Sequence, residues 1–277
     1  MLGFAALLCA SCGEEPSVMA RFVPERMDDF VWENDLVCYR AYGEALEGNP
    51  TSPGFDIWVK TPGALVADSR YEGYLKEGDK FYHTDHGNGK DCYKVSVSLG
   101  GGASAPYADG ELVYPATNFR SWKILEQKPD RVVFVLSYPA WEVCGCKVAL
   151  DKKITVVKGS RFCSVEDSYT GEFDSLTVAA GFFRHEIADE MSSADRLAIW
   201  EKPSDTSFEP EDSFIGVGLV MPDADSTCVR DCGGKMHSLA FKTIVPGEKV
   251  CYSFGSCWSR GDISSAEEWF RTVAENK

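Results

Sequence analysis

The sequence reads RVVFVLSY at residues 131–138, CKVALDKKITVV at residues 146–157 and FCSVEDSY at residues 162–169. Each run is rich in β-branched and aromatic residues, which favour strands. Short breaks separate the runs at Pro139 and at residues 158–160, and the third run ends before Thr170. This spacing is typical of consecutive antiparallel strands. The middle of the chain is therefore predicted to form an antiparallel sheet.

Strand-like runs extend this pattern to both sides, at residues 55–60, 93–99, 176–183, 213–221, 237–245 and 249–258. Helical periodicity is confined to residues 264–274, where Ser264 or Ser265 can cap the first turn. Many short strands without repeats or alternating helices favour a β-sandwich. We therefore predict an all-β protein, with one antiparallel β-sandwich domain over residues 21–277 and a short C-terminal helix.

The composition disfavours nucleic acid as a partner. Asp and Glu outnumber Lys and Arg by 43 to 28, which gives a formal net charge of −15. No cluster of basic residues stands out that would neutralise phosphates. By exclusion, the partner we expect is a carbohydrate.

The first residues predict export. Residues 2–12 form an apolar run that is too short to span a bilayer but suits a signal peptide. Ala10-Ser11-Cys12 resembles the end of a bacterial lipobox, in which the cysteine receives lipid. We expect residues 1–20 to be a signal or lipoprotein segment and tether, with Cys12 as the only membrane anchor of a periplasmic or outer-membrane protein. A plain cleaved signal and a structural N-terminal segment are the alternatives.

Cysteines form three closely spaced pairs: Cys144/Cys146, Cys228/Cys232 and Cys251/Cys257. None has partner histidines at the spacing of a standard zinc site, so no metal is predicted. In an exported protein, a disulfide could close the loop between Cys228 and Cys232, and another could join neighbouring strands through Cys251 and Cys257. The alternative is that the cysteines are small buried hydrophobic residues.

Two of the four histidines lie in the segment from Tyr82 to Gly89, which reads YHTDHGNG. If this segment is extended, Tyr82 and His86 share one face while His83 and Asp85 share the other. Tyr82 and His86 are then a candidate acid–base pair. Polar loop packing is the alternative. A metal site fits less well, because ligands on opposite faces cannot all reach one ion; we predict no cofactor.

A second dense region covers residues 24–43. Its arginines can hold a carboxylate, its neighbouring polar side chains can bind hydroxyl groups, and tryptophans can stack on a pyranose ring. The predicted substrate-binding residues are Arg26, Trp32, Glu33, Asn34, Arg40, Trp58, Lys60 and His83. Each of these types is also common as an internal ion pair or a core aromatic residue.

His185 and Glu186 follow the strand-like run 176–183 and can face a cleft at its end. The predicted catalytic residues are therefore Tyr82, His86, His185, Asp85 and Glu186. His237 lies inside a strand-like run, and we predict a structural role for it.

Several motifs carry a resemblance to a known family. They are the segments 24–26, 32–35, 40–43, 56–60, 82–87, 91–93 and 99–102, which read PER, WEND, RAYG, DIWVK, YHTDHG, DCY and LGGG. Together they resemble the family catalogued as domain of unknown function 4861, from about Arg21 to Trp269. The resemblance implies an exported protein of polysaccharide-degrading bacteria and a supersandwich similar to galactose mutarotase and to polysaccharide lyases. It brings no established reaction.

These observations predict an enzyme of acidic-polysaccharide breakdown, a uronate lyase or a glycoside hydrolase. In a lyase, Arg26 or Arg40 would neutralise the uronate carboxylate, Tyr82 or His86 would remove the C5 proton, and His185 or the other member of that pair would protonate the leaving oxygen. In a hydrolase, Asp85 and Glu186 would be the carboxylate pair. A mutarotase-like reaction would need only His86 and Glu186. The alternatives are a non-catalytic surface lipoprotein that binds sugar, and a structural module without a pocket.

Overall fold

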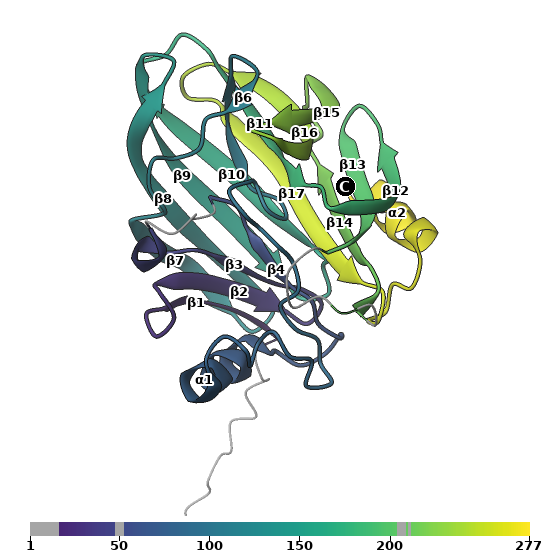
Figure 1. The fold of residues 1–277 in the computed structure, drawn as a ribbon. Helices are drawn as coiled ribbons and strands as arrows, with labels where there is room; N and C mark the ends of the chain where they lie inside the picture. Colours follow the sequence, from purple (N-terminus) through teal and green to yellow (C-terminus); the bar gives the residue numbers. More distant parts are fainter. Residues whose placement is uncertain (1–16, 48–52, 204–208, 210–211) are drawn as a thin grey trace, which may run out of the picture.

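The computed structural model describes residues 17–47, 53–203, 209 and 212–277. Its strands form three antiparallel sheets, of which the largest has eight strands in the order β12-β13-β14-β17-β10-β9-β8-β7. Figure 1 shows the two smaller sheets in front of the long strands of the large sheet. The predicted all-β sandwich is confirmed.

The large sheet contains the three strand-like runs at residues 131–138, 146–157 and 162–169. Its strands are β7 (Ser121–Lys128), β8 (Arg131–Val143), β9 (Cys146–Val157), β10 (Phe162–Gly171), β12 (Glu186–Ser192), β13 (Arg196–Lys202), β14 (Ile215–Val220) and β17 (Lys249–Trp258). In β9, Val148, Leu150, Ile154 and Val156 alternate toward the core, as the two-residue period of a strand requires.

Two smaller sheets cover the inner face of the large sheet. One has the order β1 (Val18–Val23), β2 (Asp29–Asn34), β3 (Cys38–Ala41) and β4 (Asp56–Trp58). The other has the order β15 (Ser226–Cys232), β16 (Lys235–Ile244), β11 (Leu176–Phe183), β5 (Ser104–Ala108) and β6 (Glu111–Leu112). Aromatic rings pack between the layers: the ring centroids of Phe30 and Phe134 are 4.7 Å apart, and those of Phe55 and Phe254 are 5.2 Å apart. These contacts exclude water from the centre of the sandwich.

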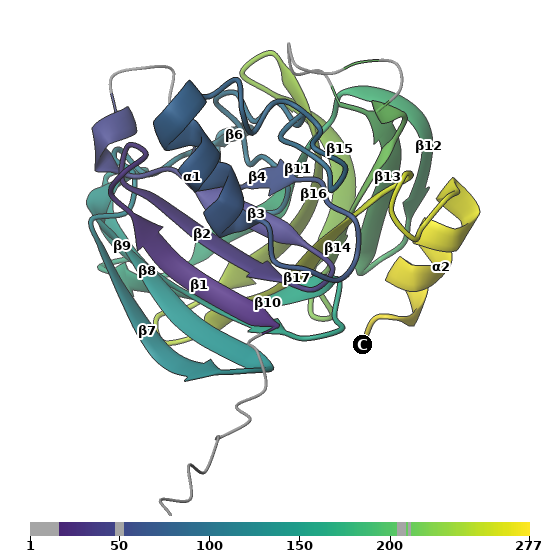
Figure 2. The ribbon, with the colours of Figure 1, turned by 90° about the horizontal axis from the view of Figure 1, so that it is seen from below.

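Two α-helices and one short 3-10 helix, η1 (Glu44–Leu46), accompany the sheets in the described part of the chain. Helix α1 (Ala67–Glu77) packs Tyr71 against Val31 and Trp58, on the side of the β1–β4 sheet that faces away from the large sheet. Helix α2 (Ala266–Glu275) packs Trp269 and Val273 against the outer face of β13 and β14. Figure 2 shows the two helices on separate sides of the sandwich. Neither α-helix is long and apolar enough to cross a membrane.

The predicted elements differ from the structure in several places. The C-terminal helix is confirmed, and Ser265 caps it by accepting a bond from the Glu268 N–H at 3.3 Å. Residues 93–99, predicted as a strand, do not form one: residues 96–99 make a turn, with Ser96 at a φ of 55°. Helix α1, the 3-10 helix η1 and the strands β1, β2, β3, β5, β6, β7, β12, β13 and β15 were not predicted.

One buried ion pair lies inside the sandwich. Lys152 on β9 is directly opposite Asp167 on β10, and its Nζ is 2.7 Å from both carboxylate oxygens. Ser104 donates to the same carboxylate, and Lys152 also reaches the Ser104 and Tyr252 hydroxyls at 2.8 and 3.2 Å. Burial lowers the pKa of Lys152, and Asp167 opposes this shift. The pair therefore satisfies two charges that are out of contact with water.

We predict that Lys152→Met destabilises the fold by about 3–5 kcal/mol, because Asp167 is left buried without a counter-ion. The matched control is Lys153→Met, since Lys153 is the next residue on β9 and pairs with Glu166 on the solvent side. Exposed pairs of this kind contribute at most about 1 kcal/mol. Urea unfolding of both variants measures the difference, and adding Asp167→Leu to Lys152→Met is expected to recover most of the loss. Equal losses for the two lysines would contradict the assignment.

His237 on β16 is fully buried and is held by backbone groups. Its Nδ1 is 2.9 Å from the Lys235 carbonyl oxygen, and its Nε2 accepts from the Leu99 N–H at 3.5 Å. Because a carbonyl only accepts hydrogen bonds and the Leu99 N–H only donates, the neutral ring fits these partners and the charged ring does not. Burial lowers the pKa of His237 to about 4. This agrees with the predicted structural role.

This low pKa predicts acid sensitivity. Between pH 6.5 and pH 4 the unfolded chain takes up a proton at His237 and the folded chain does not, so stability is full above pH 6.5 and falls as the pH drops through 4. The loss amounts to roughly 3 kcal/mol. We expect the difference in unfolding free energy between wild type and His237→Gln to shrink by this amount from pH 7 to pH 4, as measured by urea titration. If the unfolding free energies of wild type and His237→Gln changed with pH in parallel, the low pKa of His237 would be refuted.

Candidate functional site

A buried cluster of opposite charges lies on the side of the β1–β4 sheet that faces α1. Arg40 on β3 binds Asp56 on β4 at 2.6 Å and Asp91 at 2.9 Å, and its third nitrogen is 3.6 Å from Asp29 on β2. Arg26 binds Asp29 at 3.0 Å and donates to the Tyr82 hydroxyl at 3.3 Å. We call Arg26, Asp29, Arg40, Asp56, Tyr82 and Asp91 the arginine cluster. It unites two of the predicted carboxylate-binding residues with one predicted catalytic residue.

The cluster is electrostatically closed. Although burial opposes it, the carboxylates of Asp56 and Asp91 raise the pKa of Arg40 well above its usual range. Burial raises the pKa of Asp29 to about 6, against the effect of Arg40 and Arg26. Because three protein carboxylates already surround the Arg40 guanidinium, this side chain does not fit the predicted role of neutralising a substrate carboxylate.

Tyr82 also differs from its predicted role. Burial raises its pKa, and Arg40 and Arg26 offset this shift only in part. A tyrosine acts as a base when its pKa is lowered, so Tyr82 stays protonated at neutral pH and serves as a hydrogen-bonding group. Its ring stacks on Trp58 at 5.3 Å. Tyr82 therefore has a structural role: its hydroxyl accepts a hydrogen bond from Arg26 and its ring packs at the edge of the cluster.

The arginine cluster holds the neck of a loop. The Asp91 N–H donates to the Tyr82 carbonyl at 2.7 Å, which closes residues 82–91 into one turn of chain that we call the 82–91 loop. Gly89 is required within it, because its φ is +96° and an added Cβ would lie 2.1 Å from the Val59 carbonyl oxygen. The charges of the cluster therefore fix where the loop begins and ends.

His83 and His86 lie differently from the extended prediction. Residues 81–84 form turns, and the His86 ring stacks on Phe81 at 4.1 Å with its Nε2 3.0 Å from the Phe81 carbonyl. His86 therefore does not converge with Tyr82. The His83 Nδ1 lies 2.9 Å from the Asp91 carbonyl oxygen, which can only accept. In the neutral ring the proton is thus on Nδ1 and the lone pair is on Nε2.

A pocket of about 470 Å³ opens beside this loop. Its lining residues are Lys80, His83, Thr84, Asp85, Lys90, Glu209, Asp212 and Arg260. We call it the loop pocket. It combines cationic side chains with carboxylates, and its lining residues come from three separate parts of the chain.

Ion pairs order the side chains of the loop pocket. Lys90 binds Asp212 at 2.6 Å, and Arg260 lies 3.3 Å from Asp85. The Arg260 guanidinium rests over the Trp258 ring at 4.9 Å. Against partial burial, which alone would raise it, the pKa of Asp85 is lowered by the N–H groups of Gly89 and Gly87 and by Arg260. Asp85 is therefore an anion that fixes both the loop and Arg260.

Of the charged residues that line the loop pocket, only His83 and Asp85 were predicted as site residues from the sequence. Lys90 stands only five residues after Asp85, yet Asp212 and Arg260 come from distant segments. Arg260 follows the end of β17, and Asp212 lies just before β14. No local pattern marks either residue, because only the antiparallel pairing of β14 with β17 brings them together.

Five of the predicted binding residues are structural. Trp32 and Trp58 are 0% and 1% exposed, so neither can stack on a sugar. The Glu33 carboxylate binds Lys60 at 2.6 Å and accepts from the first N–H groups of α1 at 2.7 and 2.8 Å. The Asn34 side chain ties β2 to the carbonyls of Val157 and Ser160. Lys60 also donates to the Asn34 carbonyl, so it belongs to the same interior network.

His185 and Glu186 do not line the loop pocket. Nδ1 of His185 is 2.7 Å from the buried Glu201 and its Nε2 is 2.8 Å from the Lys94 carbonyl. Although burial lowers it, Glu201 raises the pKa of His185 above its usual value. Glu186 is exposed and pairs with Lys202 at 2.8 Å on the edge of the large sheet. The predicted pairing of Asp85 with Glu186 therefore does not fit, because the two carboxylates have different neighbours.

The proposed disulfides do not fit the strands. Cys228 and Cys232 lie in the same strand, β15, and Cys251 and Cys257 lie in β17. At about 3.3 Å per residue, these pairs are roughly 13 and 20 Å apart, beyond the reach of a disulfide. Cys228, Cys232, Cys251 and Cys257 all carry free thiols. Residues 1–16, including Cys12, lie outside the described residues, so the lipid anchor stays a prediction.

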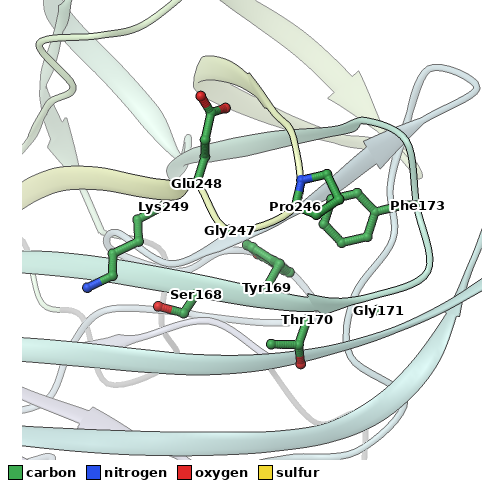
Figure 3. Close-up of a pocket in the computed structure, with 9 residues that line it drawn as sticks. All are labelled: Ser168, Tyr169, Thr170, Gly171, Phe173, Pro246, Gly247, Glu248 and Lys249. Carbon is green, nitrogen blue, oxygen red and sulfur yellow. The ribbon is translucent and has the colours of Figure 1, made fainter.

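Figure 3 shows another pocket, of about 290 Å³, at the start of β17, the opposite end of that strand from Arg260. Tyr169 and Phe173 line it together with the turn from Pro246 to Lys249. It contains none of the predicted site residues. Among the described residues, no group of three His, Cys, Asp or Glu side chains is arranged to hold a metal ion.

Comparison with solved structures gives limited likenesses. The structure of heparinase III aligns with 91% of this chain, and the aligned part covers 37% of the heparinase chain. The TM-score is 0.40 and the sequence identity is 9%. The structure of the α-galactosidase AgaB of Geobacillus stearothermophilus aligns with 87% of this chain, and the aligned part covers 41% of the galactosidase chain. The TM-score is 0.42 and the sequence identity is 10%. Likenesses of this extent say nothing about a shared activity.

Comparison of sequences gives a clear relative and a family. "Uncharacterized protein P7" of Formosa agariphila is 32% identical over 271 residues, which cover 92% of this chain and 66% of that protein. This chain thus spans just under two thirds of the length of its curated relative. The family model described as "Domain of unknown function (DUF4861)" matches residues 10–277. The chain therefore belongs to the DUF4861 family.

Proposed function

We propose that this protein takes part in the breakdown of acidic polysaccharides and binds a uronate unit in the loop pocket. One observation carries the proposal: a single pocket presents Lys80, Lys90 and Arg260 together with the carboxylates of Asp85 and Asp212. A uronate has the complementary groups, since its carboxylate needs cationic donors and its hydroxyls can donate to carboxylates. The pocket volume of about 470 Å³ falls in the range of small-ligand sites.

Arg260 is the best-placed group for the substrate carboxylate. Its planar guanidinium can bind a carboxylate through two parallel hydrogen bonds, and stacking on Trp258 already restricts its orientation. Arg260 and Lys90 now face Asp85 and Asp212. A uronate carboxylate would compete for these cations, so the protein's own carboxylates hold the cations in place until substrate arrives.

Catalysis is a second candidate, and the tautomer of His83 favours it. With the Nδ1 proton directed at the Asp91 carbonyl, the Nε2 lone pair of the neutral ring can accept a proton. In a uronate lyase this base would take the C5 proton, the C4–O bond would break, and the leaving oxygen would gain a proton. In a glycoside hydrolase, Asp85 and another pocket carboxylate would replace the Asp85 and Glu186 pair. This candidate moves the acid–base role from Tyr82 and His86 to His83.

A surface lipoprotein that captures sugar without converting it is the alternative. It uses the same pocket and needs no proton transfer at His83. Export with a lipid at Cys12 would place that pocket outside the cytoplasm, where polysaccharide fragments are found. The two functions differ in turnover and share their binding residues.

We predict that Arg260→Ala weakens binding of uronate tetrasaccharides about ten- to hundredfold, the effect of losing charged hydrogen bonds. Isothermal titration calorimetry with tetragalacturonate, and with cellotetraose as a neutral ligand, measures this loss. The matched control is Lys249→Ala, which removes one positive charge at the other end of β17, where Lys249 pairs with Glu166. Comparable losses in the two variants, or equal binding of the neutral sugar, would exclude a specific uronate site.

Turnover is tested separately with uronate polysaccharides. Absorbance of an unsaturated product reports elimination, and reducing ends without that absorbance report hydrolysis. We expect His83→Gln to lower the rate of elimination by at least about a hundredfold, the usual contribution of an acid–base group, while binding changes little. Binding without any product from the wild-type protein would reject catalysis and favour the capture protein.

A further inference from the structure

The hairpin tip between β8 and β9 carries two thiols. Val143 pairs with Cys146, so Cys144 and Gly145 form a two-residue turn between the strands. Their φ angles are +49° and +79°. Such turns favour Asn, Asp or Gly at both positions, because side chains resist a positive φ. Cys144 therefore occupies a position for which cysteine is conformationally unfavourable.

Both thiols of this tip line one pocket. The pocket measures about 370 Å³ and includes Tyr107, Phe173 and Asp174 in its wall. Cys144 is exposed and Cys146 is half-buried. Two Cα–Cα steps bent at a turn span about 6 Å, within the range of about 4.4–6.8 Å that a disulfide bridges. The Cys144 and Cys146 side chains are thus close enough to react with each other.

Within the described residues, Cys38, Cys163, Cys251 and Cys257 lack this combination. Burial raises the pKa of Cys163 to about 12, and Cys38 and Cys257 are buried as well. Thiols in such apolar surroundings are poor nucleophiles. Cys251 is exposed, but its i+6 neighbour on β17, Cys257, points into a different part of the core. The pair at the hairpin tip therefore combines access with a neighbouring thiol.

We propose that Cys144 and Cys146 form a reversible disulfide by exchange with small-molecule disulfides. The Cys144 thiolate attacks one sulfur of an external disulfide, forming a mixed disulfide and releasing one thiol. Cys146 then attacks Cys144, and the second external thiol leaves. Two protein thiols are oxidised, one external disulfide is reduced, and the two protein protons go to the released thiols. An exposed bond closing so small a ring is readily reduced again.

Oxidised glutathione is the probe, applied to the folded full-length protein. We expect the intact mass to fall by two hydrogens without retained glutathione, and peptide mapping to place the bond between Cys144 and Cys146. Dithiothreitol should reverse it. In Cys146→Ser the second step is blocked, so Cys144 should retain at least tenfold more glutathione than in the wild type. Serine nearly matches cysteine in size, and circular dichroism checks that the variant folds.

The matched control is Cys251→Ser, which removes an exposed thiol outside the hairpin. It should form the Cys144–Cys146 bond as the wild type does. The proposal is overturned if the wild type accumulates only mixed disulfides, if the bond joins another pair, or if Cys251→Ser abolishes it. It is also overturned if Cys146→Ser retains no more glutathione than the wild type.

Discussion

Arg40 is the constraint on which the rest of the candidate site depends. A guanidinium taken out of water must be matched by acceptors in the protein interior. Asp56 and Asp91 supply them from β4 and from the end of the 82–91 loop, and Asp29 on β2 adds a third negative charge nearby. One buried cation thereby joins the small sheet to the loop that forms the pocket. The position of His83 and Asp85 follows from an interaction that is closed to solvent.

The central strands were predictable because their side chains alternate between core and solvent over many residues. Helix α1 was not, because its sequence ADSRYEGYLKE has little helical periodicity and includes Gly73, whose missing side chain leaves room for Phe81. Its first N–H groups are bound by Glu33, more than thirty residues earlier. Residues 93–99 show the opposite case, since apolar alternation there serves packing of Val95 and Leu99 in a segment that forms no strand.

The site was predictable only in part. The dense polar segment from Tyr82 to Asn88 pointed to the loop that lines the loop pocket. The sequence could not show that this segment turns, which separates His86 from Tyr82. Burial was equally invisible: arginines, tryptophans and carboxylates suited to a sugar are also the residues that build a charged interior. Asp212 and Arg260 could be placed only once strand pairing was known, because each is local to a different part of the chain.

The buried pair of Lys152 and Asp167 also bears on how the large sheet chooses its alignment. Side chains alternate faces along a strand, so sliding β9 past β10 by one residue would bring the outward-facing residues of one strand opposite the inward-facing residues of the other. Sliding by two would keep both charges inside and separate them. Either arrangement leaves a charge without its partner. The interior ion pair thus specifies the register of β9 against β10, which a purely apolar interface of Val, Ile and Leu would specify less strictly.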